Sequence, residues 1–142
     1  MIIDADGLIM GRLASLVAKK LLEGEEVKIV NAESVVITGT KHKILQRYKE
    51  KRARTNKHHG PFFPRMPDRI LKRTVRGMLP YKQYKGRKAF KRLRVYIGVP
   101  DKIEKDKIES YEQFHIKNSN ARTYIRLGEL SRLLGANFGE EG

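Results

Sequence analysis

A strand, a helix and a second strand follow one another within the first 30 residues, and this order constrains the fold more than any other sequence feature. Ile2-Ile3 predicts a short strand, and the apolar side chains of residues 11–22 recur at the spacings of three and four that are typical of an amphipathic helix. Gly24 stands where a left-handed cap ends a helix, and residues 27–30 predict the next strand. Such a unit joins two parallel strands by a right-handed crossover, and it therefore predicts an α/β fold.

The rest of the chain adds few further elements. Residues 35–37 predict a third strand before a Thr38-Gly39 turn, and residues 95–97 predict another strand. Residues 127–134 predict a short helix that Gly135 ends. The length of 142 residues is close to the roughly 150 residues of an average domain, so we expect a single domain over residues 1–142.

Several functional classes are excluded by what the sequence lacks. It contains no cysteine, which excludes disulfides, thiolate metal ligands and a cysteine nucleophile. No apolar run approaches the roughly 18 residues of a membrane-spanning helix, and the first residues carry acids where a signal peptide carries basic side chains. We therefore expect a cytoplasmic protein with no membrane partner.

The positive charge is concentrated in one central stretch. The chain carries 31 Lys and Arg against 16 Asp and Glu, a net charge of +15. Residues 41–94 hold 20 basic and two acidic side chains, whereas the segments before and after them are close to neutral. Because this concentration stores repulsion that a polyanion would relieve, it indicates a binding surface within residues 41–94. Nucleic acid and an anionic membrane surface are the polyanions to consider.

Two stretches of this block predict helices with one cationic and one apolar face. The cationic arc of residues 68–79, which follow the helix-start signal Pro67, carries Arg69, Lys72, Arg73 and Arg76. The opposite arc carries Ile70, Leu71, Val75, Met78 and Leu79. In residues 86–94 the cationic side carries Arg87, Lys88, Lys91, Arg92 and Arg94, opposite Ala89, Phe90 and Leu93. Ordinary solvated helices mix charge signs, so nine cations without an acid favour a nucleic-acid surface.

Residues 41–57 predict a further basic helix, which Ile44, Leu45 and Tyr48 can anchor in its first half. Residues 49–65 have little to bury, so we expect this segment to order fully only on RNA. Within it, the adjacent Phe62 and Phe63 are either platforms for stacked bases or local anchors of the loop.

No motif in the sequence contains all the residues that the corresponding enzyme chemistry requires. The Gly7–Gly11 segment has three residues between its glycines where a Walker loop has four, so we expect a tight strand-to-helix turn. The His58-His59 pair lacks a third metal ligand at a usable spacing. Asp4 and Asp6 are candidates for a carboxylate pair, but Asp6-Gly7 is explained more simply as turn chemistry. We therefore expect no catalytic residue, metal, cofactor or small-molecule substrate.

Motifs along nearly the whole chain resemble one family. Three of them resemble the opening of the large-subunit ribosomal protein L-thirteen family: Gly11-Arg12-Leu13-Ala14-Ser15, Val30-Asn31-Ala32-Glu33 and Thr38-Gly39. Two more resemble its centre: Arg73-Thr74-Val75-Arg76-Gly77-Met78-Leu79-Pro80 and Lys85-Gly86-Arg87. The Gly60-Pro61 loop and the closing residues 127–131 are similar to the archaeal branch.

This resemblance implies a three-layer α/β/α domain on a small, mainly parallel sheet with basic helical and loop insertions. It implies a structural constituent of the large ribosomal subunit that binds large-subunit ribosomal RNA beside neighbouring ribosomal proteins and supports subunit assembly and translation. It also implies RNA contacts by ten cations of the central block: Arg69, Lys72, Arg73, Arg76, Lys82, Lys85, Arg87, Lys88, Lys91 and Arg92.

Two other functions stay open at this point. An RNA-modifying or nucleotide-dependent enzyme would require a cofactor loop or a catalytic set. A regulator of messenger RNA outside the ribosome would use the same basic face.

Overall fold

A four-stranded parallel sheet organises the molecule. The computed structural model of the chain describes residues 1–53 and 64–138. The sheet has the order β4-β2-β1-β5, and its strands are β1 (Ile2–Asp4), β2 (Val27–Val30), β4 (Leu93–Val95) and β5 (Ile108–Glu109). Every pairing in this sheet is parallel. The predicted α/β class and the parallel pairing of β1 with β2 are therefore confirmed.

A second, two-stranded sheet pairs distant parts of the chain. In it β3 (Val36–Thr38) runs antiparallel to β6 (Tyr124–Arg126), with Ile37 opposite Ile125. Helix α5 (Leu127–Leu133) follows β6 directly, and it confirms the short helix that the sequence predicts over residues 127–134. Gly135 after it has a φ of +100°.

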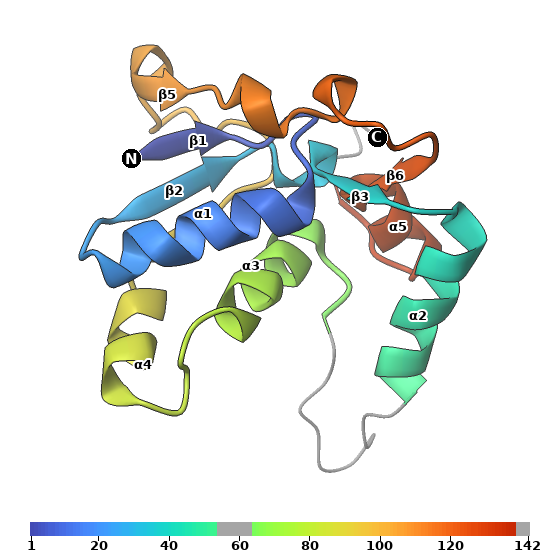
Figure 1. The fold of residues 1–142 in the computed structure, drawn as a ribbon, viewed down its shortest axis with the longest axis horizontal. Coiled ribbons are helices and arrows are strands. Elements are labelled where there is room, and N and C mark those ends of the chain that lie inside the picture. The colour runs from blue at the N-terminus through green and yellow to red at the C-terminus, as the bar shows by residue number, and fades with distance from the viewer. Residues whose placement is uncertain (54–63, 139–142) are drawn as a thin grey trace.

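Three helices lie together on one side of the main sheet (Figure 1). They are α1 (Met10–Leu22), α3 (Pro67–Gly77) and α4 (Tyr84–Phe90). Helix α2 (Lys41–Ala53) follows β3 at the edge of the molecule. Four single-turn 3-10 helices complete the described elements: η1 (Ala32–Ser34), η2 (Lys105–Lys107), η3 (Glu112–Phe114) and η4 (Ile116–Asn118).

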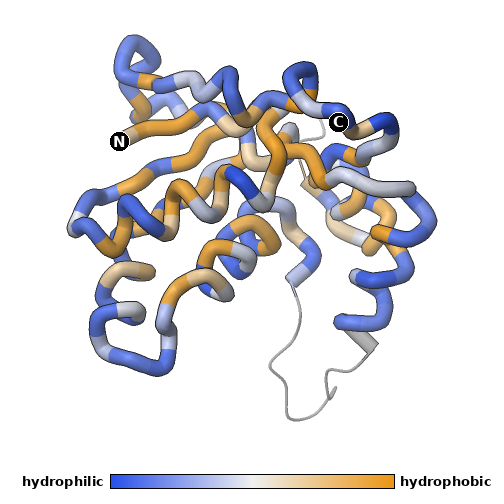
Figure 2. The backbone as a smooth tube through the Cα atoms, viewed as in Figure 1, coloured by the Kyte–Doolittle hydropathy of each residue, from blue (hydrophilic) through white to orange (hydrophobic). Residues whose placement is uncertain are grey.

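The core forms where the main sheet meets α1 and α3. Leu13 and Leu21 of α1, Ile29 of β2 and Leu71 and Val75 of α3 all have no exposed surface. Figure 2 shows hydrophobic stretches concentrated where β1, β2, α1 and α3 meet, and hydrophilic stretches along α2. The apolar spacing that predicts these two helices therefore marks their buried sides.

The predicted helix over residues 86–94 is wrong in its second half. Helix α4 ends at Phe90, and Leu93 enters strand β4 opposite Val27 of β2. A buried Leu93 is compatible with a helix and with a strand, and the pairing with β2 makes this segment a strand. The strand expected at residues 95–97 consequently begins two residues earlier. The expected burial of Met78 is also wrong, because α3 ends at Gly77 and leaves Met78 44% exposed.

Helix α2 has the anchors that the sequence predicts. Ile44 and Tyr48 are buried, and Leu45 is half-buried. Residues 49–53 belong to this helix. The other expectations for this part of the chain, including His58, His59, Phe62 and Phe63, lie outside the described residues.

Candidate nucleic-acid interface

The four cations of α3 lie along one open surface. Arg69 is exposed, and Lys72, Arg73 and Arg76 are half-buried. All four line a hollow of about 370 Å³ together with Pro64 and Phe90. The structure therefore brings together the first four predicted RNA contacts.

A second hollow adjoins the first, because Arg73 and Arg76 line both. It measures about 500 Å³ and follows the chain from the end of α3 into the next turn. Its other lining residues are Gly77, Leu79, Pro80, Tyr81, Lys82 and Gln83. Among the residues that the structure describes, neither lining includes an acid, so the two hollows form one continuous cationic surface.

Aromatic rings, not carboxylates, hold two of the α3 cations. The rings of Tyr81 and Phe90 meet edge to face with centroids 5.7 Å apart. The guanidinium carbon of Arg76 lies 3.9 Å from the centroid of Tyr81, and Nζ of Lys72 lies 5.3 Å from that of Phe90. A cation–π contact of this kind contributes about 0.5–1 kcal/mol at an exposed site and leaves the positive charge unneutralised. These two cations are thus positioned and still available to an anion.

The turn after α3 is fixed by two residues of α4. Nη1 of Arg87 donates to the carbonyl oxygen of Lys82 at 2.9 Å and to that of Tyr81 at 3.4 Å. A side chain on Gly86 would collide with the carbonyl group of Pro80, so only glycine permits this close approach. Arg87 therefore positions the turn that carries Lys82, in addition to any contact with a ligand. Lys85 and Lys88 of α4 point into solvent.

Lys91 and Arg92 belong to a different part of the surface. Together with Glu26, Lys28, Arg94 and Tyr96 they line a separate hollow of about 240 Å³. Nη1 of Arg92 also donates to the carbonyl oxygen of Leu21 in α1, at 2.9 Å. The single cationic side expected for residues 86–94 is thus divided, because the chain leaves the helical conformation after Phe90.

Helix α2 contributes cations that the predicted site does not include. Burial lowers the pKa of the Lys51 ammonium, and the nearby charges of Arg47 and Arg73 lower it further. Nζ of Lys51 lies 4.8 Å from the centroid of Tyr48. Lys51 lies on α2 and Arg73 lies on α3, and the two helices are far apart in the sequence. The apolar anchors of α2 are the one sequence feature that indicates how this helix packs, and therefore that these two cations come close together.

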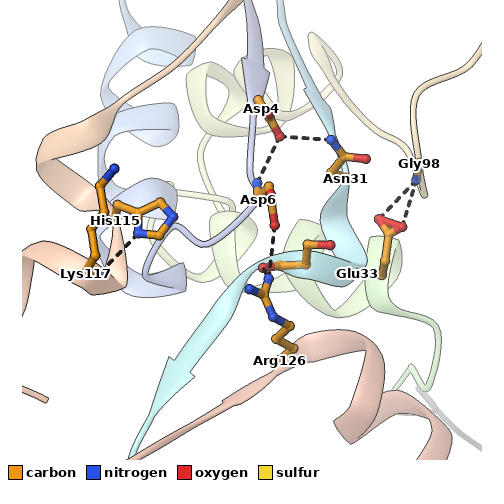
Figure 3. Close-up of polar contacts among 9 residues, drawn as sticks. Asp4, Asp6, Asn31, Glu33, Gly98, His115, Lys117 and Arg126 are labelled. Carbon is orange, nitrogen blue, oxygen red and sulfur yellow. Dashed lines mark hydrogen bonds and ion pairs between the residues drawn. The ribbon is translucent and has the colours of Figure 1, made fainter. Parts of the chain in front are cut away.

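The two aspartates near the N-terminus have structural partners (Figure 3). Oδ1 of Asp4 accepts hydrogen bonds from the backbone N–H of Asp6 at 3.0 Å and from Nδ2 of Asn31 at 2.9 Å. Oδ1 of Asp6 forms an ion pair with Nη1 of Arg126 at 3.0 Å. The predicted turn at Asp6-Gly7 is confirmed, because the N–H of Leu8 donates to the carbonyl oxygen of Ala5 across it at 3.0 Å.

The Gly7 turn is closed by His115. Gly7 has a φ of +74°, and a side chain there would collide with the imidazole ring. Nδ1 of that ring accepts a hydrogen bond from the backbone N–H of Lys117 (Figure 3). Within residues 1–53 and 64–138, no group of three or more His, Asp or Glu residues is placed to hold a metal ion. No helix in the same ranges is both long and apolar enough to cross a membrane.

The chain is similar to proteins of the ribosome. The curated relatives are ribosomal proteins named "Large ribosomal subunit protein uL13". The relative from Archaeoglobus fulgidus is 52% identical over 94% of this chain and 86% of its own length. The relative from Methanosarcina barkeri is 50% identical over 96% of this chain and 99% of its own length. The relative from Methanocaldococcus jannaschii is 52% identical over 96% of this chain and 98% of its own length.

The family model described as "Ribosomal protein L13" matches residues 1–102. The chain belongs to the ribosomal protein L13 family, and its archaeal relatives agree with the resemblance seen in the sequence.

Proposed function

We propose that this protein is a structural constituent of the large ribosomal subunit and binds large-subunit ribosomal RNA. The observation that supports this proposal most directly is the pair of adjoining hollows around α3, whose described lining residues include cations and no acid. The names of the relatives support the choice of ribosomal RNA over another polyanion. Such a protein works in the cytoplasm beside neighbouring ribosomal proteins and performs no catalysis.

The RNA contacts fall into groups that the fold separates. The α3 group consists of Arg69, Lys72, Arg73 and Arg76. The group on the turn and α4 consists of Lys82, Lys85, Arg87 and Lys88. The edge group beside β4 consists of Lys91 and Arg92. Lys51 joins the α3 group, because its charge lies close to that of Arg73.

The protein acts as a folded clamp in this proposal. The α3 and edge groups line different hollows, so they contact different phosphates. The core between α1, α3 and the sheet fixes the distance between these groups, and RNA segments that bind both are held together in subunit assembly. Binding also relieves the repulsion among cations that the free protein tolerates.

Salt dependence tests the proposed phosphate contacts. Six to ten such contacts would reduce the affinity for large-subunit ribosomal RNA by roughly three to five orders of magnitude between about 50 and 200 mM salt. Filter binding across a salt series measures this slope. An affinity that barely changes with salt would contradict the phosphate clamp.

Fractionation of cell extract on a sucrose gradient tests the ribosomal location. The protein should sediment with the large subunit. Sedimentation with free messenger RNA would favour the regulatory alternative, and a nucleotide retained by the purified protein would favour the enzyme.

A further inference from the structure

Tyr84 presents an aromatic ring to solvent and directly follows Gln83, which lines the larger hollow beside α3. It is the first residue of α4 and is 71% exposed. No hydrogen bond, ion pair or ring contact joins its side chain to another described residue. Tyr81 and Phe90, by contrast, are engaged with each other and with Arg76 and Lys72.

Exposed cations surround this ring in the sequence and on the helix. Lys82 and Lys85 stand on either side of it along the chain, and both are exposed. Lys88 lies one helical turn further along α4, on the same side as Tyr84. No ion pair joins these three lysines to another described residue, so their charges are available to a ligand.

The backbone under Tyr84 is held without help from its ring. The N–H of Gln83 donates to the carbonyl oxygen of Pro80 at 2.9 Å, and Arg87 binds the carbonyl of Lys82 at 2.9 Å. Gly86 packs directly against the carbonyl of Pro80. The ring is therefore carried on a fixed support and contributes little burial to the fold.

We propose that Tyr84 is a stacking platform for one unpaired nucleobase of bound RNA, while Lys85 and Lys88 contact the flanking phosphates. An aromatic ring beside cations is the arrangement with which proteins bind single-stranded nucleic acid. A base inside a duplex is already stacked on its neighbours and cannot use the platform. This inference rests on the proposed RNA binding and specifies the form of RNA that this part of the surface takes.

A single tryptophan tests the stacking directly. The chain contains no Trp, so Tyr84→Trp creates its only indole. Tyr124→Trp is the matched control, because Tyr124 is also exposed, at 47%, but lies on β6. At low salt, a short oligoadenylate should quench the fluorescence of Tyr84→Trp. An adenine–uracil duplex of the same length should not quench it, and neither probe should quench Tyr124→Trp. Oligoadenylate that binds without quenching Tyr84→Trp would overturn the inference.

Affinity measurements separate this inference from the proposed function. Tyr84→Phe should bind oligoadenylate like the unmodified chain, whereas Tyr84→Leu should lose about 5- to 150-fold in affinity with an unchanged salt slope. If Tyr84→Leu binds normally while Arg69→Ala weakens binding, the stacking platform is wrong and the basic interface stands. If Tyr84→Leu binds RNA normally but is lost from the large subunit, the ring contacts a protein, which also overturns the inference. If the unmodified chain binds no RNA, both proposals fall.

Discussion

Arg92, the residue before β4, reaches the end of α1, where its Nη1 donates to the carbonyl oxygen of Leu21 at 2.9 Å across 71 residues of sequence. The last carbonyls of a helix have no partner within it, and a cation there also meets the negative end of the helix dipole. A residue that the sequence assigns to RNA therefore also joins two parts of the domain.

Arg92→Ala should lower the free energy of unfolding by roughly 1.5 kcal/mol, the lower end for a hydrogen bond to a charged group, since Arg92 is half-buried. Lys91→Ala is the matched control, because Lys91 is exposed and neighbours Arg92. Its stability should change by less than about 0.5 kcal/mol. Urea unfolding of both free proteins measures the difference. Equal stabilities would mean that the bond to Leu21 contributes nothing.

Arg76→Ala should affect both stability and binding. Removal of the guanidinium from the Tyr81 ring should cost about 0.5–1 kcal/mol, and the affinity for ribosomal RNA should fall. Arg69→Ala should weaken RNA binding without a measurable loss of stability, because Arg69 is exposed. Thermal melting and filter binding of the two variants separate these effects. A lower melting temperature for Arg69→Ala than for Arg76→Ala would contradict the assignment.

The same substitution at two apolar positions near the end of α3 tests its buried side. Val75→Asp buries an unpaired carboxylate where no surface is exposed, and it should cost several kcal/mol, enough to unfold a domain of ordinary stability. Met78→Asp should cost less than about 1 kcal/mol, because Met78 is 44% exposed. Circular dichroism and solubility report the outcome. Normal folding of Val75→Asp would require a rotated helix.

Lys51→Met should stabilise the free protein at neutral pH. The pKa of Lys51 in the folded protein lies below its usual 10.5, through burial and repulsion, so the unfolded state holds the proton more tightly. Because of Lys51, the free energy of unfolding therefore rises with pH between the lowered pKa of this group and 10.5. The gain in stability from Lys51→Met should be largest below this pH range and should become smaller as the pH rises through it.

Melting temperatures over a pH series measure that advantage relative to the unmodified chain. Lys49 and Lys51 are both exposed on α2, but it is Lys51 whose charge is close to those of Arg47 and Arg73, so Lys49→Met should show no comparable gain at neutral pH. A Lys51→Met protein that melts lower than the unmodified chain at neutral pH would show that the ammonium stabilises the fold.

Two glycine-to-alanine variants should have opposite effects. In Gly86→Ala the new methyl group meets the carbonyl of Pro80, and overpacking of this kind costs about 1–3 kcal/mol. In Gly11→Ala the methyl group enters open space within α1, and the lower entropy of the unfolded chain should stabilise the protein by about 0.4–1 kcal/mol. Chemical denaturation of both variants tests the pair. An unchanged stability of Gly86→Ala would mean that the turn before α4 can shift to make room for the methyl group.

Features that depend on neighbouring residues could be predicted from the sequence. The apolar spacing of α1 and α3 marks the sides that the structure buries. Gly24 and Gly135 adopt the positive φ that their positions after helices predict, and Pro67 occupies the first turn of α3. The concentration of positive charge in residues 41–94 and the family motifs are equally visible without coordinates.

Which distant residues lie together depends on the tertiary structure. Leu93 and Arg94 suit a helix locally, but pairing of β4 with β2 draws them into the sheet. That pairing takes Lys91 and Arg92 to a hollow away from the α3 cations. Packing of α2 brings Lys51 close to Arg73. A local sequence pattern indicates only which side of a helix or strand is apolar. The partner that covers this side, and the cations brought together as a result, depend on contacts formed across the whole chain.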